Sequence, residues 1–151
     1  MELSSPAFAD HGLLPAAFTG DGADRSPPLC WRDVPPGTQA FALVVEDPDA
    51  PAGLWVHWVL YDLPGALREL PEAQPPQGTL ASGARQGRNS LGRLGYNGPS
   101  PPPGKAHRYF FRLIALGAPT GLPAGATRAE LVRALENRIL GEAQWVGTYR
   151  R

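Results

Sequence analysis

Residues 41–64 read FALVVEDPDAPAGLWVHWVLYDLP, and the rest of the chain is predicted to be arranged around them. Phe41–Val45 is β-branched and aromatic, which is typical of a strand. Two prolines then stiffen the acidic turn Asp47–Pro51, because proline fixes its own φ and restricts the residue before it. Leu54–Leu63 is apolar on both faces, which indicates a second strand in the middle of a covered sheet.

The second strand contains one ionisable side chain, His57, and Asp47 stands at the end of the first strand. A stiff turn that holds a carboxylate near an interior histidine is expected to form the wall of a pocket. Three aromatic side chains could line the pocket mouth, although core packing is the expected use of Trp55, Trp58 and Tyr61.

Length and composition indicate one domain, residues 1–151, with one core. A hydrophobic fraction of 42% allows a packed interior, and 18 glycines with 18 prolines indicate many turns on a β-rich scaffold. The chain starts without the basic and apolar segments of a signal peptide, and no span approaches the roughly 20 apolar residues that cross a bilayer. We therefore expect a soluble, cytoplasmic protein with no stable membrane insertion.

The single cysteine, Cys30, excludes an internal disulfide and a thiolate metal cage, and its place beside Trp31 predicts a small core residue. No cofactor and no structural metal are expected.

Charge is unevenly distributed although the formal net charge is zero. Residues 1–72 hold eleven acidic and three basic side chains, whereas Ala73–Ala129 holds seven basic side chains and no acid. This basic segment could create a favourable field for an anion, or the two halves could simply attract each other. Nucleic-acid binding is not expected, because the basic residues are dispersed and the total charge is nil.

Further along the chain, Pro64–Gly104 shows little regular structure, and such a long loop is expected only where it serves a site. His107–Leu116 is predicted to be the third strand, with alternate residues from His107 and Tyr109 onward facing the core.

A helix is predicted near the C-terminus, followed by a last short strand at Gln144–Tyr149. Thr127 and Glu130 form a capping box that opens the helix. The apolar stripe and its closing C-cap are formed by Leu131, Val132, Leu135, Ile139 and Gly141. Extended runs without intervening helices predict a mainly β protein, an antiparallel sheet or sandwich with one late helix packed on it.

Asp47, His57 and His107 form the candidate constellation, although each alone has a structural explanation as a turn residue or a hydrogen-bonded core histidine. The loop Gly95–Gly104, GYNGPSPPPG, comes directly before His107. Its prolines make it stiff and its glycines make it permissive, so it could present backbone N–H groups in a concave array that holds an anion.

Several motifs carry a resemblance to a known family. DPDAP followed by VHW, then GYNGPSPPPG and HRYFF, closely resemble the phosphatidylethanolamine-binding protein (PEBP) family, in particular its bacterial and archaeal Raf-kinase-inhibitor-like branch. SPAF near the start, SPPLCW and the closing ILGEAQWVGTYRR extend the resemblance over nearly the whole chain.

The resemblance implies an antiparallel β-sandwich with peripheral helices and a pocket for a phosphate-type anion or phospholipid head group. It implies the ligand-binding residues Asp47, Pro51, His57, His107 and Tyr109, with a rim formed by Gly98, Ser100 and Pro102. Eukaryotic relatives regulate other proteins, and relatives in this branch are expected to form homodimers. The chain departs from the pattern at Ser90, where relatives often have Asp, and at Gly20 and Ser100, where they often have cysteines, which puts a redox role in doubt.

The sequence thus favours a non-enzymatic anion-binding protein, regulatory through its ligand or a partner such as a kinase or protease. The alternative is a hydrolase or metal-dependent enzyme that uses Asp47, His57 and His107, since two histidines and a carboxylate can ligate a metal. The chain has no H-x-H or H-E-x-x-H spacing, and the aligned pocket contains no evident serine or cysteine nucleophile.

Overall fold

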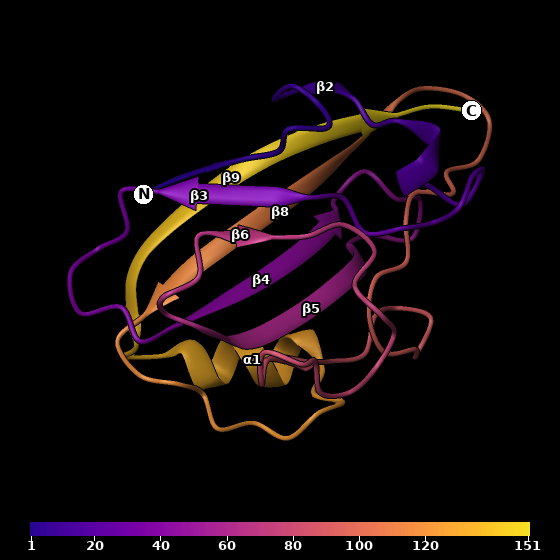
Figure 1. The fold of residues 1–151 in the computed structure, drawn as a ribbon. Coiled ribbons are helices and arrows are strands. Elements are labelled where there is room, and N and C mark those ends of the chain that lie inside the picture. Colours follow the sequence, from indigo (N-terminus) through magenta and orange to yellow (C-terminus); the bar gives the residue numbers. More distant parts are fainter.

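The computed structural model describes all 151 residues as two β-sheets and one α-helix (Figure 1). The larger sheet has the strand order β2-β9-β8-β4-β5-β7, and the smaller sheet has the order β1-β3-β6. The strands are β1 (Glu2–Ser4), β2 (Gly12–Leu13), β3 (Leu29–Arg32), β4 (Ala40–Asp47), β5 (Trp55–Pro64), β6 (Glu69–Leu70), β7 (Arg85–Gln86), β8 (His107–Leu116) and β9 (Ile139–Tyr149). A short 3-10 helix (Ala16–Phe18) and helix α1 (Arg128–Leu135) complete the regular structure.

The predicted mainly β architecture is confirmed, and β4 is the centre of the large sheet. Every residue of β4 is buried, and the strand pairs antiparallel with β5 on one side and β8 on the other. The second predicted strand begins at Trp55, because Leu54 is exposed and lies outside the pairing. One strand pair departs from the antiparallel prediction, since β2 runs parallel to the end of β9.

Two apolar layers cover the two faces of the large sheet. The layer between the sheets contains Phe41, Trp58 and Phe111, and the layer between the large sheet and α1 contains Tyr61 and Leu131. The predicted alternation in β8 is confirmed, because His107, Tyr109 and the residues in step with them are buried towards the small sheet. Burial of the long apolar strands against both layers is the main stabilisation of the fold.

The predicted start of α1 is confirmed, but its predicted end is wrong. The Thr127 hydroxyl accepts from the Glu130 N–H at 3.2 Å, and the Glu130 carboxylate accepts from the Thr127 N–H at 3.1 Å. The helix ends at Leu135, and Asn137 adopts a left-handed φ of 64° that turns the chain back towards the sheet. Ile139 and Gly141 therefore begin β9, where pairing with β8 outweighs continuation of the helical stripe. No helix is long and apolar enough to cross a membrane.

Ion pairs between the two halves of the chain neutralise part of the uneven charge. Buried Glu46 of β4 accepts from Arg112 at 3.0 Å and from Arg128 at 2.6 Å. Asp49, in the turn after β4, forms a two-pronged ion pair with Arg108, with both N···O distances at 2.9 Å. Three of the seven cations in the acid-free segment are therefore neutralised by acids from the first half of the chain, as the second alternative predicted.

The irregular segment between β7 and β8 lies beside β5 and is hydrogen-bonded to it. The N–H groups of Gly87, Ser90 and Asn97 donate to three carbonyls of β5, those of Val59, Val56 and His57, at 2.8–2.9 Å. Gln86 of β7 is fully buried and anchors the loop before β7: its amide oxygen accepts from Trp58 Nε1 at 2.7 Å, and its amide nitrogen donates to the Pro75 and Gln77 carbonyls. The long loop is thus ordered by hydrogen bonds rather than by regular secondary structure.

Replacement of Gln86 by Ala is expected to lower the free energy of unfolding by about 2 kcal/mol, because it leaves the buried Trp58 Nε1 without an acceptor and removes the donor to two loop carbonyls. Urea unfolding followed by tryptophan fluorescence measures the change. Gln144→Ala is the matched control, because Gln144 is exposed on β9 and its loss should cost less than about 0.5 kcal/mol. Equal effects of the two variants would contradict the anchoring role of Gln86.

The Asp49–Arg108 pair is expected to stabilise the protein only above acidic pH. The Arg108 guanidinium lowers the pKa of the Asp49 carboxyl to about 2, against about 3.9 in the unfolded chain. The contribution is therefore complete above about pH 4 and is lost as pH falls towards 2. Because Arg108 is half exposed, we expect Asp49→Asn to cost only about 1 kcal/mol at pH 7.

Thermal unfolding from pH 7 to pH 2 tests this expectation, with Glu2→Gln as the control that removes the more exposed Glu2–Arg32 pair. The melting-temperature difference between wild type and Asp49→Asn should shrink below pH 4. A difference that stays constant down to pH 2 would show that Asp49 acts without its charge.

Candidate functional site

A cavity of about 340 Å³ opens where three central strands meet. Because β4 runs antiparallel to β5 and β8, its last residues lie beside the first residues of both neighbours. This topology brings Asp47, His57 and His107 together from distant parts of the sequence. All eight predicted residues line this cavity: Asp47, Pro51, His57, Gly98, Ser100, Pro102, His107 and Tyr109.

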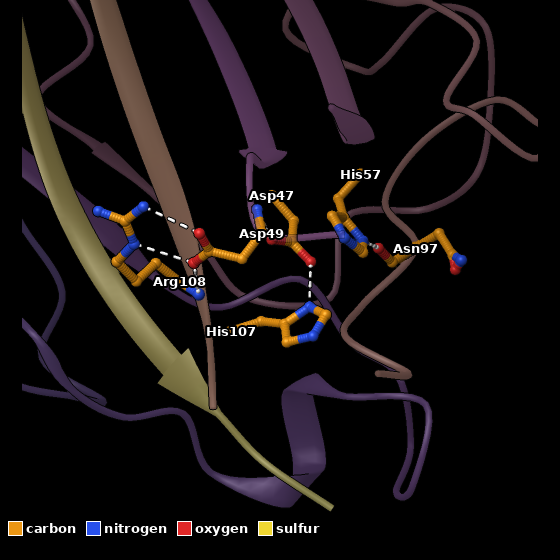
Figure 2. A network of polar contacts seen from close by, with 6 residues as sticks. All are labelled: Asp47, Asp49, His57, Asn97, His107 and Arg108. Atoms are coloured by element: carbon orange, nitrogen blue, oxygen red, sulfur yellow. Dashed lines mark hydrogen bonds and ion pairs between the residues drawn. The ribbon is translucent and has the colours of Figure 1, made fainter. Parts of the chain in front are cut away.

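Asp47 pairs with His107 rather than with His57. Its Oδ2 lies 2.8 Å from His107 Nδ1, and both side chains are buried (Figure 2). The other carboxylate oxygen accepts from the Asp49 N–H at 2.7 Å. Since a carboxylate only accepts, Nδ1 of His107 carries the hydrogen and Nε2 is the nitrogen left for other partners. Asp47 therefore orients the imidazole and keeps no free oxygen of its own.

His57 is held twice by the backbone of Asn97. The His57 Nδ1 hydrogen-bonds the Asn97 carbonyl, and the Asn97 N–H donates to the His57 carbonyl at 2.9 Å (Figure 2). A carbonyl only accepts, so Nδ1 of His57 also carries the hydrogen. Burial lowers the pKa of the His57 imidazole, which favours its neutral form in the unliganded protein.

Tyr109 lies between the two histidines. Its ring centroid is 5.2 Å from that of His57 and 6.5 Å from that of His107. Burial raises the pKa of the Tyr109 hydroxyl, so the group keeps its hydrogen at physiological pH. Every fully buried polar side-chain atom in the structure has a hydrogen-bond partner. The Tyr109 hydroxyl and the Nε2 atoms of His57 and His107 have no hydrogen-bond partner, so these three atoms are not fully buried. Because the three residues line the cavity, we infer that these atoms face it.

The rim of the cavity is mostly apolar, and it supplies fewer backbone donors than the sequence predicted. The expected array of free N–H groups is wrong for Asn97, which donates to His57, and for Gly98, which donates to Asp24 Oδ1 at 2.8 Å. Between Gly98 and Gly104 only Ser100 has an N–H, because the other residues there are prolines. Ala50, Trp55, Leu91, Asn97 and Pro101 also line the cavity.

Sequence reasoning missed most of these additional residues for identifiable reasons. Leu91 is an exposed loop residue that no motif marks. Asn97 acts through its backbone, which residue type does not reveal. Trp55 was considered for both the mouth and the core; it lines the cavity, whereas Trp58 and Tyr61 are fully buried in the core.

Three residues that depart from the pattern of the family that the sequence resembles are Ser90, Gly20 and Ser100. Ser90 accepts from the Val56 N–H at 2.8 Å and thus holds the start of β5. A Cβ placed on Gly20 would lie 3.4 Å from Ser100 Cβ and would overlap the Ser100 hydroxyl. Gly20 and Ser100, the two positions where the resemblance leads us to expect cysteines, are therefore spatial neighbours.

The cavity is not the largest hollow of the molecule, but it contains the convergent polar groups. A hollow of about 530 Å³ between β1 and β9 is lined by Cys30, Trp31 and Trp145 and contains no histidine. Cys30 is half-buried there, 3.2 Å from the Ser4 hydroxyl, rather than in the core as predicted. No group of three His, Cys, Asp or Glu side chains in the chain is arranged so that it could hold a metal ion.

Comparison with known proteins gives consistent matches over the whole chain. The family described as phosphatidylethanolamine-binding protein matches residues 4–150. A UPF0098 protein of Methanothermobacter thermautotrophicus is 46% identical, with 100% of this chain and 99% of that protein aligned. A UPF0098 protein of Aquifex aeolicus is 45% identical over 100% of this chain and 89% of its own length.

Two solved structures are similar to this chain in both fold and sequence. A PEBP homolog from Chlamydia trachomatis superposes with a TM-score of 0.91 at 35% identity, covering 99% of this chain and 97% of its own. E. coli YbcL, described as a member of the mammalian PEBP family, superposes with a TM-score of 0.92 at 31% identity, covering 99% and 98%. Together with the convergence of Asp47, His57 and His107 on one cavity, these matches show that the chain belongs to the phosphatidylethanolamine-binding protein family.

Proposed function

We propose that this protein binds a phosphate-type anion in the cavity and does not transform it. The observation that carries the proposal is the set of three unpaired polar atoms, Nε2 of His57, Nε2 of His107 and the Tyr109 hydroxyl, in one cavity of about 340 Å³. That volume is at the lower end of ligand pockets and suits a head group rather than a large cofactor. Membership of a family named for binding phosphatidylethanolamine supports the same ligand chemistry.

The electrostatics of the cavity favour an anion. Asp47 is the one acidic side chain of the lining, and both of its oxygens are already engaged. A protonated His107 imidazole would balance the charge of Asp47, with which it is paired. A bound phosphate oxygen would accept from the Tyr109 hydroxyl and from protonated Nε2 atoms, and such charge-assisted bonds are about twice as strong as neutral ones.

The arrangement supports binding rather than covalent chemistry. Ser100 lines the cavity, but its hydroxyl makes no hydrogen bond to either histidine, so no base is positioned to activate it. Cys30 lines a different hollow. A regulated partner protein, such as a kinase or a protease, would place a phosphorylated or acidic residue in the same cavity, so free phosphate should displace it.

Anion binding should weaken as pH rises through the histidine range. Burial lowers the pKa of His57 in the free protein, whereas a bound anion favours the charged imidazole. Binding therefore takes up a proton, and affinity falls once free His57 has lost it. We expect sulfate to bind at least about tenfold more tightly at pH 6 than at pH 8 in isothermal calorimetry.

Sulfate is the first probe because its charge stays constant in this range, whereas phosphoethanolamine, the second probe, titrates near pH 6. His57→Gln should reduce the pH dependence. His11→Gln is the control, because His11 is exposed and does not line the cavity. Equal wild-type affinity at pH 6 and pH 8 would remove His57 from the binding mechanism.

A further inference from the structure

We propose that Asp24 is a positioning residue of this site and acts on His57 through an intervening peptide group. The inference deepens the proposed function and rests on it, because Asp24 would serve the binding of the anion. The effect of Asp24 on His57 can nevertheless be measured without a ligand. Asp24 was not marked by any sequence motif and does not line the anion cavity. Its link to the site becomes visible only in the hydrogen-bond network.

One peptide group connects the two side chains. The Gly98 N–H donates to Asp24 Oδ1 at 2.8 Å, and the Asn97 carbonyl of the same peptide unit accepts from His57 Nδ1. The order is therefore carboxylate, amide N–H, amide C=O, imidazole N–H. Hydrogen bonds in such a chain polarise one another, so the carboxylate makes the carbonyl a stronger acceptor for Nδ1.

This chain repeats at His57 what Asp47 does directly at His107. Asp47 contacts His107 Nδ1 at 2.8 Å, whereas Asp24 reaches His57 Nδ1 across one peptide group. In both cases a carboxylate lies behind Nδ1 and leaves Nε2 for the cavity. The two imidazoles are thereby held with the hydrogen on Nδ1, so each Nε2 becomes a donor towards the cavity when its ring takes up a second proton.

The local geometry shows that the Asp24 contact is built into the fold. Asp24 has a left-handed φ of 56°, which Asp tolerates better than most residues. A Cβ at Gly98 would overlap Asp24 Oδ1 and the Phe18 carbonyl, so only glycine allows this approach. Two flanking hydrogen bonds, from Tyr96 to Phe18 and from Gly20 to Pro99, hold the same two segments together.

Asp24 is an exposed residue whose charge no ion pair neutralises. Asp24 forms none of the ion pairs of the structure, which engage the acids Glu2, Asp10, Asp21, Glu46, Asp47, Asp49 and Glu72. The groups that face His57 are Asn97, Tyr109, Asp47, His107 and, across the peptide, Asp24. Burial lowers the pKa of His57, and the carboxylates of Asp47 and Asp24 oppose this while His107 adds to it.

Asp24→Asn in the full-length protein separates the charge from the hydrogen bond, because the amide oxygen can still accept from Gly98. The ring nitrogens of His57 are followed by ¹⁵N NMR during a pH titration without ligand. We expect the His57 titration midpoint to shift to lower pH. The pH above which sulfate affinity is lost should shift in the same direction.

Asp62→Asn is the matched control. Asp62 has the same φ of 56° and also accepts from backbone N–H groups, those of Thr120 and Gly121, but it lies outside the cavity network. It should leave His57 unchanged. Asp24→Ala, which also removes the acceptor, should additionally increase the fraction of the other His57 tautomer.

An unchanged His57 midpoint and tautomer in both Asp24 variants would overturn the proposal and leave Asp24 as a simple loop contact. If sulfate and phosphoethanolamine fail to bind the wild type at any pH while the His57 midpoint still shifts in Asp24→Asn, the peptide relay stands and the proposed function fails. If both ligands bind with the expected pH dependence but the midpoint does not shift, the relay alone fails.

Discussion

The buried hydrogen bond between Asp47 and His107 is the interaction on which the site depends. It joins the last residue of β4 to the first residue of β8, and both side chains are nearly removed from solvent. A carboxylate in such a place is costly unless each oxygen has a donor, and here the Asp49 N–H supplies the second. The adjacent Asp49–Arg108 pair repeats the connection one step further out, so the turn after β4 is attached to β8 at two points.

Hydrogen bonds within the protein also determine which polar atoms face the cavity. Acceptors inside the protein occupy Nδ1 of both histidines, and donors inside the protein occupy both oxygens of Asp47. The groups that face the cavity are therefore one hydroxyl and two Nε2 atoms. Each Nε2 atom can donate a hydrogen bond to an anion when it carries a hydrogen. The apolar rim lowers the local dielectric and strengthens such contacts. Binding and proton uptake are thus coupled through His57, whose burial disfavours the charge that an anion would restore.

Much of the fold could be predicted because it follows from local patterns. The long strands are apolar and β-branched, the capping box of α1 is a short-range motif, and alternation in β8 separates its two faces. The end of α1 could not be predicted in the same way. Ile139 and Gly141 fit a helical stripe and its cap, but pairing of β9 with β8 along its whole length is a long-range interaction that outweighs the local preference. The free N–H array failed for a similar reason, since Asn97 and Gly98 use their N–H groups on β5 and Asp24.

The sequence alone determined the type of fold, which follows from residue types and their spacing, and its motifs carried the family resemblance that implied eight of the residues lining the cavity. Only the tertiary structure decided which partner each of them has. Asp47 could have oriented either histidine, and strand register assigns it to His107 and leaves His57 to the Asn97 backbone. Hydrogen-bond partners depend on distances of a few tenths of an ångström between segments far apart in the chain, and no local pattern of residues contains that information.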